Sequence, residues 1–279
     1  MSRTPSSGHP TPAELLAYKI ARGIAVGISR IYLPGGVVGR ENLPASGAYL
    51  VAPVHRSYVD WLIVARITGR RRLRYIAKAE IWKSKLVGRI LEGLGVFPVN
   101  RSGADREALE RCREVLAGGE PLIMFPEGTR RSGPVVTDLR EGVAYLAIRA
   151  GVPVVPIGIG GSEQAMPRGS SLPRPRRVEV VIGKPVWPPT ASGADASDAA
   201  ALGADSTDVA SAADEEGSGG SADPGPVSGR GEPPSGDTVR RRKTGRVSRR
   251  ATKEFSDEIA TAMQQVFDEA QRRARVKRD

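Results

Sequence analysis

After residue 34 the chain alternates between short apolar runs and longer stretches whose apolar residues recur at helical spacing. A short apolar run bounded by turn residues is typical of a buried strand, and the helical period is typical of an amphipathic helix. The predicted strands occupy residues 48–53, 73–77, 95–99, 121–125, 154–159 and 177–183. The predicted helices occupy residues 57–68, 79–94, 104–119 and 140–151. Because strands and helices alternate, residues 35–189 are expected to form an α/β core, with a largely parallel sheet flanked by helices.

The first 34 residues contain an amphipathic helical pattern between Pro12 and Leu33. One side of this helix gathers Leu16, Ile20, Ile24, Ile28 and Ile31, and the opposite side gathers Lys19, Arg22 and Arg30. These charges leave no run of about 20 apolar residues, the length needed to span a bilayer. The pattern fits a helix lying in a membrane interface and, equally, a helix packed on the protein core. We expect residues 1–34 to form a leader and a membrane-associating helix.

The hydrophobic pattern stops over residues 190–250, which are rich in Gly, Ser, Ala, Asp and Pro and end in the basic run "RRRKTGRVSRR". A segment with so few large apolar residues cannot repay the entropy lost on ordering, so it is predicted to be a disordered linker. Residues 251–279 return to helical spacing, with apolar residues at every fourth position, namely Phe255, Ile259, Met263 and Phe267. This C-terminal amphipathic helix should dock on the core, which makes the linker an insertion before the last helix.

Charge is distributed unevenly along the chain. The formal net charge is +11, yet residues 191–239 hold ten acidic residues against one base. That segment is therefore −9 and the rest of the chain is +20, two values that together give the total of +11. The strongly basic remainder of the chain is expected to bind an anionic partner: nucleic acid, an anionic lipid surface or a phosphorylated substrate. The single cysteine, Cys112, excludes an internal disulfide and a cysteine-based zinc cluster, and it fits a reducing cytoplasm.

His55 is the first candidate for chemistry, because it directly follows a predicted buried strand. Open α/β sheets bind their ligands at the carboxyl ends of strands. If Ser57 caps the next helix, Asp60 lies in its first turn and its carboxylate can turn back toward the imidazole. A carboxylate on one ring nitrogen fixes the tautomer and leaves the other nitrogen to accept a proton. On these residues alone, a purely structural histidine is the competing interpretation.

Four segments occur in a fixed order, each at the end of a predicted strand or on one. They are "HRSYVD" (55–60), "GVFPVNR" (95–101), "FPEGTR" (125–130) and "VPVVPIGI" (152–159). This set resembles the glycerolipid acyltransferase family, in particular its 1-acylglycerol-3-phosphate acyltransferases, over about residues 35–185. The family's blocks are an HxxxxD motif, a block ending in Arg, an FPEGTR-type block and a proline-bearing apolar strand.

The chain departs from the family pattern at two positions. Val54 stands where many members have Asn, and Pro98 interrupts the apolar run of the second block. Neither departure removes a catalytic group that the resemblance implies, although both could alter substrate preference.

The resemblance implies an enzyme that moves a fatty acyl group from acyl-CoA or acyl carrier protein to the free hydroxyl of 1-acylglycerol 3-phosphate, giving phosphatidic acid. Such a transfer needs a base for the hydroxyl, donors for the oxyanion and cations for the acceptor phosphate. His55 is expected to be the base and Asp60 its orienting partner. The expected substrate-binding residues are Arg101, Glu127, Gly128, Thr129 and Arg130.

The residues of this set have different expected roles. Arg101 and Arg130 offer planar guanidinium forks for a phosphate. Gly128 would let the backbone approach the ligand closely. Glu127 either orders the arginines and the loop or contacts the acceptor glycerol, and the structural alternative for Arg130 is a salt bridge to Glu127. No metal is expected, and no cofactor besides the acyl-thioester co-substrate.

Two rival functions fit parts of the same sequence. One is an acyltransferase with the same His–Asp pair that acts on another lysophospholipid or on a lysoglycolipid. The other is a non-catalytic protein whose basic surface binds anionic membranes or nucleic acids. A simple binder would not require His55 and Asp60, so we expect the enzyme, with no nucleic-acid partner. The expected location is peripheral, on the cytoplasmic face of a membrane with an anionic surface.

Overall fold

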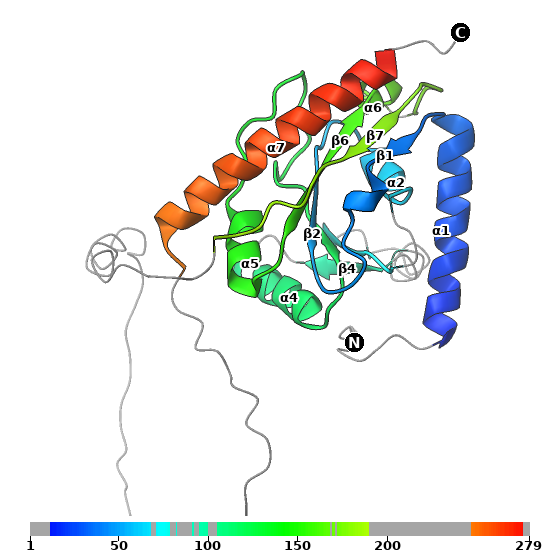
Figure 1. Cartoon of the computed structure of the whole chain (residues 1–279). Helices are drawn as coiled ribbons and strands as arrows, with labels where there is room; N and C mark the ends of the chain where they lie inside the picture. Colours follow the sequence, from blue (N-terminus) through cyan, green and yellow to red (C-terminus); the bar gives the residue numbers. More distant parts are fainter. Residues whose placement is uncertain are drawn as a thin grey trace, which may run out of the picture. The chain divides into compact units, whose positions relative to one another are not determined.

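The computed structural model describes residues 12–67, 71–78, 82, 91, 95–99, 105–167, 169–170, 172–189 and 247–275 (Figure 1). Four of the predictions fall outside this part of the chain: the leader before residue 12, Arg101, nearly all of the helix expected over residues 79–94, and most of the linker expected over residues 190–250. These four remain predictions.

Within the described residues, seven strands form one sheet in the order β1-β7-β6-β2-β5-β3-β4. They are β1 (Val37–Val38), β2 (Leu50–Pro53), β3 (Arg74–Lys78), β4 (Val96–Val99), β5 (Leu122–Ile123), β6 (Val154–Gly160) and β7 (Glu179–Ile182). Neighbouring strands run parallel except β6 and β7, which are antiparallel. The predicted largely parallel sheet is confirmed, with β7 and β1 reversed relative to the rest. All residues of β2 and β6 are buried, so these adjacent strands form the centre of the core.

Helices cover both faces of this sheet. On one face α4 (Asp105–Ala117), α5 (Gly142–Ala150) and α7 (Arg249–Arg275) form a layer, and α1 (Pro12–Tyr32) contacts α2 (Asp60–Val64) on the other (Figure 1). The connection from β2 to β3, which contains α2, crosses the sheet in one direction, and the connections that contain α4 and α5 cross it in the other. Because such connections are right-handed, α2 lies on the face opposite to α4 and α5. A short helix, α6 (Ser162–Ala165), follows β6, and a 3-10 turn spans Arg40–Asn42.

The C-terminal helix α7 docks on β6 and β7 through the apolar stripe that its sequence predicts. The buried side chains at four-residue spacing are Phe255, Ile259, Met263 and Phe267, each contributing about 1.5–3 kcal/mol by its burial. Gly158 and Gly160 of β6 permit a close approach, because a Cβ at either position would collide with a backbone carbonyl of α7, that of Val266 or that of Ala270. Helix and strand therefore touch backbone to backbone.

Helix α1 is held to the core by the side that carries Ser29, and not by its isoleucines. The side chain of Arg66 is buried, and its Nε donates to the Ser29 hydroxyl at 2.6 Å. Its Nη2 donates to the carbonyl oxygens of Ser29 and Leu33 near the carboxyl end of the helix. Burial lowers the pKa of the Arg66 guanidinium to about 10, so at neutral pH it keeps the positive charge that complements this end of the helix dipole.

The apolar side of α1 is exposed, including Ile20, Ile24, Ile28 and Ile31. The side that packs on the core carries Tyr18, Ala25 and Ser29 instead. The alternative in which the isoleucine side packs on the core is therefore wrong. Among the described residues, no helix combines the length and the apolar character needed to cross a membrane.

Cys112 on α4 provides a chemical check of this core. Its side chain is fully buried, and burial raises the pKa of its thiol to about 12. The reactive form is the thiolate, and at pH 8 roughly one such thiol in ten thousand is ionised. We expect the folded protein to be inert to dithionitrobenzoate at pH 8 and to react stoichiometrically in guanidinium chloride. A Cys112→Ala variant gives the blank, and rapid reaction of the native protein in buffer would contradict this packing.

Candidate active site

The two most specific motifs meet at one edge of the sheet. Strands β2 and β5 are parallel neighbours, with Leu50 opposite Leu122 and Val51 opposite Ile123. "HRSYVD" follows β2 and "FPEGTR" follows β5, so both loops leave the sheet at its carboxyl edge, where open α/β sheets bind ligands. The backbone N–H of Arg131 donates to the carbonyl of His55 at 2.8 Å, which joins the loops directly.

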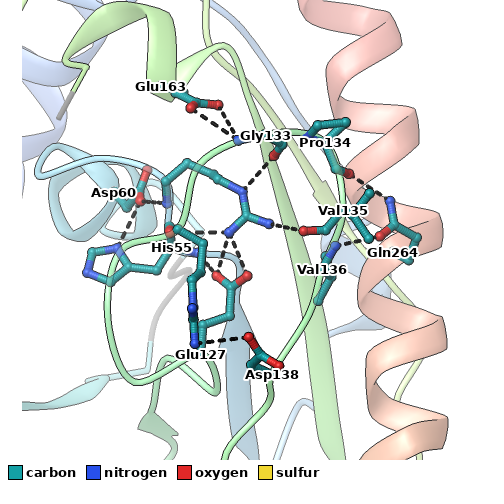
Figure 2. A network of polar contacts seen from close by, with 12 residues as sticks. His55, Asp60, Glu127, Gly133, Pro134, Val135, Val136, Asp138, Glu163 and Gln264 are labelled. Carbon is teal, nitrogen blue, oxygen red and sulfur yellow. Dashed lines mark hydrogen bonds and ion pairs between the residues drawn. The ribbon is translucent and has the colours of Figure 1, made fainter.

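His55 and Asp60 form the predicted pair. His55 Nδ1 lies 3.0 Å from Asp60 Oδ2 (Figure 2). The same oxygen accepts the backbone N–H groups of Arg56 and Ser57, each at 2.7 Å. The Asp60 carboxylate is fully buried, whereas 21% of the His55 side chain is exposed. Three donors therefore hold the carboxylate in place, and the imidazole remains open to a substrate.

This geometry selects one form of the imidazole. An acceptor facing Nδ1 favours the tautomer that carries its proton there and leaves a lone pair on Nε2. The ring of His55 also lies against that of Phe125, with centroids 4.3 Å apart. Its orientation is thus held by a carboxylate on one side and by an aromatic face from the FPEGTR loop on the other.

Ser57 does not cap the helix, contrary to expectation. Helix α2 begins at Asp60 with Val59 at its N-cap, and no side chain bonds there. The Ser57 hydroxyl instead donates to the carbonyl of Met166 at 3.0 Å. Asp60 still reaches His55, because its carboxylate binds the backbone of residues 56 and 57 in the loop that precedes the helix.

Glu127 is committed to the protein itself. Its side chain is fully buried, and both carboxylate oxygens accept from Arg56 Nη1, at 2.5 and 2.7 Å. Its Oε2 also accepts the backbone N–H of His55 at 2.8 Å. Of the two roles expected for Glu127, these contacts favour ordering of the loop over contact with an acceptor glycerol.

Arg56 is the residue of this site that sequence reasoning missed. Its guanidinium is buried; Nε donates to the Gly133 carbonyl at 3.1 Å and Nη2 to the Val135 carbonyl at 3.0 Å. Its Cζ also lies 4.9 Å from the centre of the Phe267 ring. The available signal was its place inside HRSYVD, where a charge next to a buried strand needs a partner of opposite sign.

Arg130 lies against an aromatic ring. Its guanidinium carbon is 3.2 Å from the centre of the Tyr58 ring, and 51% of Tyr58 is exposed. The salt bridge considered between Arg130 and Glu127 is wrong, because Glu127 pairs with Arg56. Within the described residues Arg130 forms no ion pair, and its Nη1 has no hydrogen-bond partner. The neighbouring Arg131 pairs with Asp138 at 3.4 Å.

The other two predicted site residues, Gly128 and Thr129, make fewer described contacts. Gly128 has φ +65°, a left-handed conformation that favours glycine, and a Cβ there would collide with the Arg140 side chain. The described contact at Gly128 is therefore with the protein, where an approach to ligand was expected. Thr129 is exposed beside it. In the described ranges no group of three or more His, Cys, Asp or Glu side chains could hold a metal ion.

Comparisons with known proteins identify the family of the chain. The family model described as Acyltransferase matches residues 36–160. The chain is 34% identical over 170 residues to a 1-acyl-sn-glycerol-3-phosphate acyltransferase of Chlamydomonas reinhardtii, covering 59% of this chain and 50% of the relative. It is 30% identical over 156 residues to the 1-acyl-sn-glycerol-3-phosphate acyltransferase of Bacillus subtilis (strain 168), covering 55% of this chain and 75% of the relative. The crystal structure of the 1-acyl-sn-glycerophosphate (LPA) acyltransferase PlsC from Thermotoga maritima aligns with TM-score 0.55 and 27% identity, covering 64% of this chain and 73% of that one.

These matches differ in how much of each relative they cover. The chain spans about half the length of the algal and Brassica napus relatives, 50% and 44%, but 75% of the bacterial one. Residues 36–160 contain both motif loops, so the resemblance noted in the sequence is confirmed by the family model and by the bacterial relatives. The chain belongs to the glycerolipid acyltransferase family, and within it to the 1-acyl-sn-glycerol-3-phosphate acyltransferase type.

Proposed function

We propose that this protein transfers a fatty acyl group from a thioester, acyl-CoA or acyl carrier protein, to the free hydroxyl of 1-acylglycerol 3-phosphate, yielding phosphatidic acid. The observation that carries the proposal is the pair of His55 and Asp60, whose open imidazole lies on the loop that also carries Tyr58 and the Arg130 stacked on it. The names of the algal and bacterial relatives support the same reaction. A purely structural histidine would not need a buried carboxylate together with an exposed ring.

The chemistry follows from the free nitrogen of His55. The acceptor hydroxyl oxygen attacks the thioester carbonyl carbon while His55 Nε2 takes its proton. The Asp60 carboxylate stabilises the imidazolium that forms. The tetrahedral intermediate then collapses: the new C–O ester bond stays, the C–S bond breaks, and the leaving thiolate takes the proton from His55. No acylated side chain is required, because the acceptor's own hydroxyl is the nucleophile.

Arg130 is the proposed ligand of the acceptor phosphate. Its guanidinium stacks on Tyr58 and lacks an ion-pair partner among the described residues, and its buried Nη1 has no hydrogen-bond partner, so it keeps donors that a bound phosphate would satisfy. Family resemblance adds Arg101, which lies outside the described residues. An unpaired cation near the base favours a phosphorylated acceptor over a neutral lysoglycolipid. Thiol release from acyl-CoA with a panel of lysophosphatidate, other lysophospholipids and lysoglycolipids tests this choice.

The proposal includes peripheral attachment to a membrane, because both acceptor and product are lipids. Helix α1 has an exposed apolar side with Ile20, Ile24 and Ile28, and it carries Lys19 and Arg30 at exposed positions. An amphipathic helix of this kind lies parallel to an anionic surface, with its apolar side inserted and its bases near lipid phosphates. We propose that the cytoplasmic face is the surface concerned.

Removal of the base is the most direct test. We expect His55→Ala to abolish transfer and Asp60→Asn to lower kcat by on the order of 10²–10⁴-fold, because neither the tautomer nor the imidazolium is then supported. Thiol release measures the rate, and circular dichroism checks the fold. His9→Ala is the matched control, since His9 is the other histidine of the chain and lies in the leader. Near-normal turnover by well-folded His55→Ala protein would end this mechanism.

The phosphate site is tested at neighbouring arginines. Arg130→Ala should raise the KM for lysophosphatidate roughly tenfold to a hundredfold, since a charge-assisted contact contributes about 1.5–3 kcal/mol. Arg131→Ala also removes one positive charge, but from a residue paired with Asp138, and should change KM much less. Tyr58→Phe keeps the aromatic face and should behave as wild type, whereas Tyr58→Ala should raise KM. Equal effects of Arg130→Ala and Arg131→Ala would indicate a general charge effect and refute a specific site.

Membrane attachment is tested on the exposed side of α1. We expect Ile24→Glu combined with Ile28→Glu to release the protein from anionic vesicles while sparing transfer to a detergent-dispersed acceptor. The control, Thr261→Glu with Gln265→Glu on the exposed side of α7, adds the same charge and should stay bound. High salt should weaken wild-type binding, at about 1 kcal/mol per surface base, without abolishing it. If the α1 variant still sediments with vesicles at high salt, the membrane contact lies on another part of the protein.

A further inference from the structure

Helix α7 contacts the active-site loops although it lies beyond residues 36–160, the range matched by the family model. Figure 2 shows Gln264 of this helix beside the loop that runs from Gly133 to Val136. The same loop leads back to the FPEGTR motif, because it starts only a few residues after Arg130. A C-terminal helix at this place could be packing alone, or it could be part of the catalytic apparatus.

Gln264 binds the loop at two points. Its Oε1 accepts the backbone N–H of Val136 at 2.7 Å, and its Nε2 donates to the carbonyl of Pro134 at 3.0 Å. The side-chain amide thus pairs with the loop backbone as a neighbouring strand would. Its Nε2 also lies 2.8 Å from Asp268 Oδ1, one helical turn further on, which fixes the side chain on the helix.

Arg56 binds the same loop from the opposite side. Its guanidinium donates to the carbonyls of Gly133 and Val135. Gln264 donates to the carbonyl of Pro134 and accepts the N–H of Val136. The loop is therefore held at four consecutive residues by two side chains, alternately from each side. Phe267, one turn after Gln264 and fully buried, lies on the face of the Arg56 guanidinium.

The contacts continue from Arg56 to the catalytic pair. Its Nη1 holds both oxygens of Glu127, and Glu127 accepts the backbone N–H of His55. The backbone N–H of Arg56 itself donates to the Asp60 carboxylate that orients the imidazole. A displacement of Arg56 would therefore reach both His55 and Asp60 through bonds of 2.5–2.8 Å.

We propose that α7 completes the active site, with Gln264 and Phe267 as positioning residues that hold Arg56 and, through it, the catalytic pair. This inference rests on the proposed acyl transfer. Neither side chain is assigned a contact with substrate; they act on the angle and distance at which His55 meets the acceptor hydroxyl. Loss of either should lower kcat and leave the KM of both substrates unchanged, which distinguishes positioning from substrate binding.

The helix offers a matched control for each variant. Phe255 is buried on the same face of α7 as Phe267 without touching Arg56, so Phe255→Leu and Phe267→Leu remove the same atoms from the core. Gln265 is exposed next to Gln264. Gln265→Leu is therefore the same substitution at a residue that does not contact the loop. We expect both phenylalanine variants to lower the melting temperature. Only Phe267→Leu and Gln264→Leu should lower kcat, by about tenfold or more, because small displacements of catalytic groups carry large rate costs.

A second measurement on the full-length protein does not depend on turnover. The His55 N–H is bonded to Glu127, so hydrogen exchange at residues 54–58, followed in a longer peptide that begins several residues earlier, reports whether this chain of contacts holds. Exchange there should accelerate in Phe267→Leu and Gln264→Leu, and stay at the wild-type rate in Phe255→Leu and Gln265→Leu.

The possible outcomes distinguish a failure of the positioning role of α7 from a failure of the proposed acyl transfer. If Phe255→Leu and Phe267→Leu lower kcat equally at equal loss of melting temperature, α7 only packs and the inference is wrong. It is also wrong if exchange accelerates at residues 54–58 while kcat stays unchanged. If wild-type protein transfers no acyl group to any acceptor of the panel, the proposed function fails, and exchange alone then decides whether α7 holds the His55 loop.

Discussion

The geometry of the candidate active site depends on one buried ion pair, Arg56 with Glu127. Two charges taken out of water cost several kcal/mol each unless their remaining hydrogen-bonding groups also find partners. Here Glu127 receives the guanidinium and the N–H of His55, and the other guanidinium nitrogens reach the carbonyls of Gly133 and Val135. The loop after β2 and the loop after β5 are therefore bonded to each other through charges that neither loop can satisfy alone. A structural contact thus determines where the His55 imidazole stands.

The fold and the His–Asp pair could be predicted from the sequence for a physical reason. Strands such as β2 and β6 are buried throughout and read as continuous apolar runs, so their positions are visible without any tertiary information. Parallel neighbours end at the same edge, which brings the motifs after β2 and β5 together. The partner of Glu127 could not be predicted in this way. Arg56, Arg130 and Arg131 carry the same charge, and only the tertiary structure shows that Glu127 pairs with Arg56, the one that lies against Phe267 of α7.

Other local predictions depended on partners that are distant in sequence. Ser57 has the residue type of a helix cap, yet its hydroxyl goes to Met166, 109 residues away. The helical period of residues 12–33 separates an apolar side from a basic side, yet the side that faces the core is a third one, with Tyr18, Ala25 and Ser29. Arg66 decides this by holding Ser29, which turns the isoleucines outward. Periodicity reports amphipathicity, and only tertiary contacts assign each side its neighbour.

The three arginines of the two loops differ in what their charges are available for. Arg56 is neutralised inside the protein and Arg131 pairs with Asp138 at the surface, whereas Arg130 lies on Tyr58 without an ion pair among the described residues. Glu127 is the nearest carboxylate to Arg130 in sequence, and a pairing between them would cancel the charge that an anionic acceptor needs. Because Arg56 occupies both oxygens of Glu127, that competition is removed. The same ion pair that holds the His55 backbone therefore also leaves Arg130 without Glu127 as a partner.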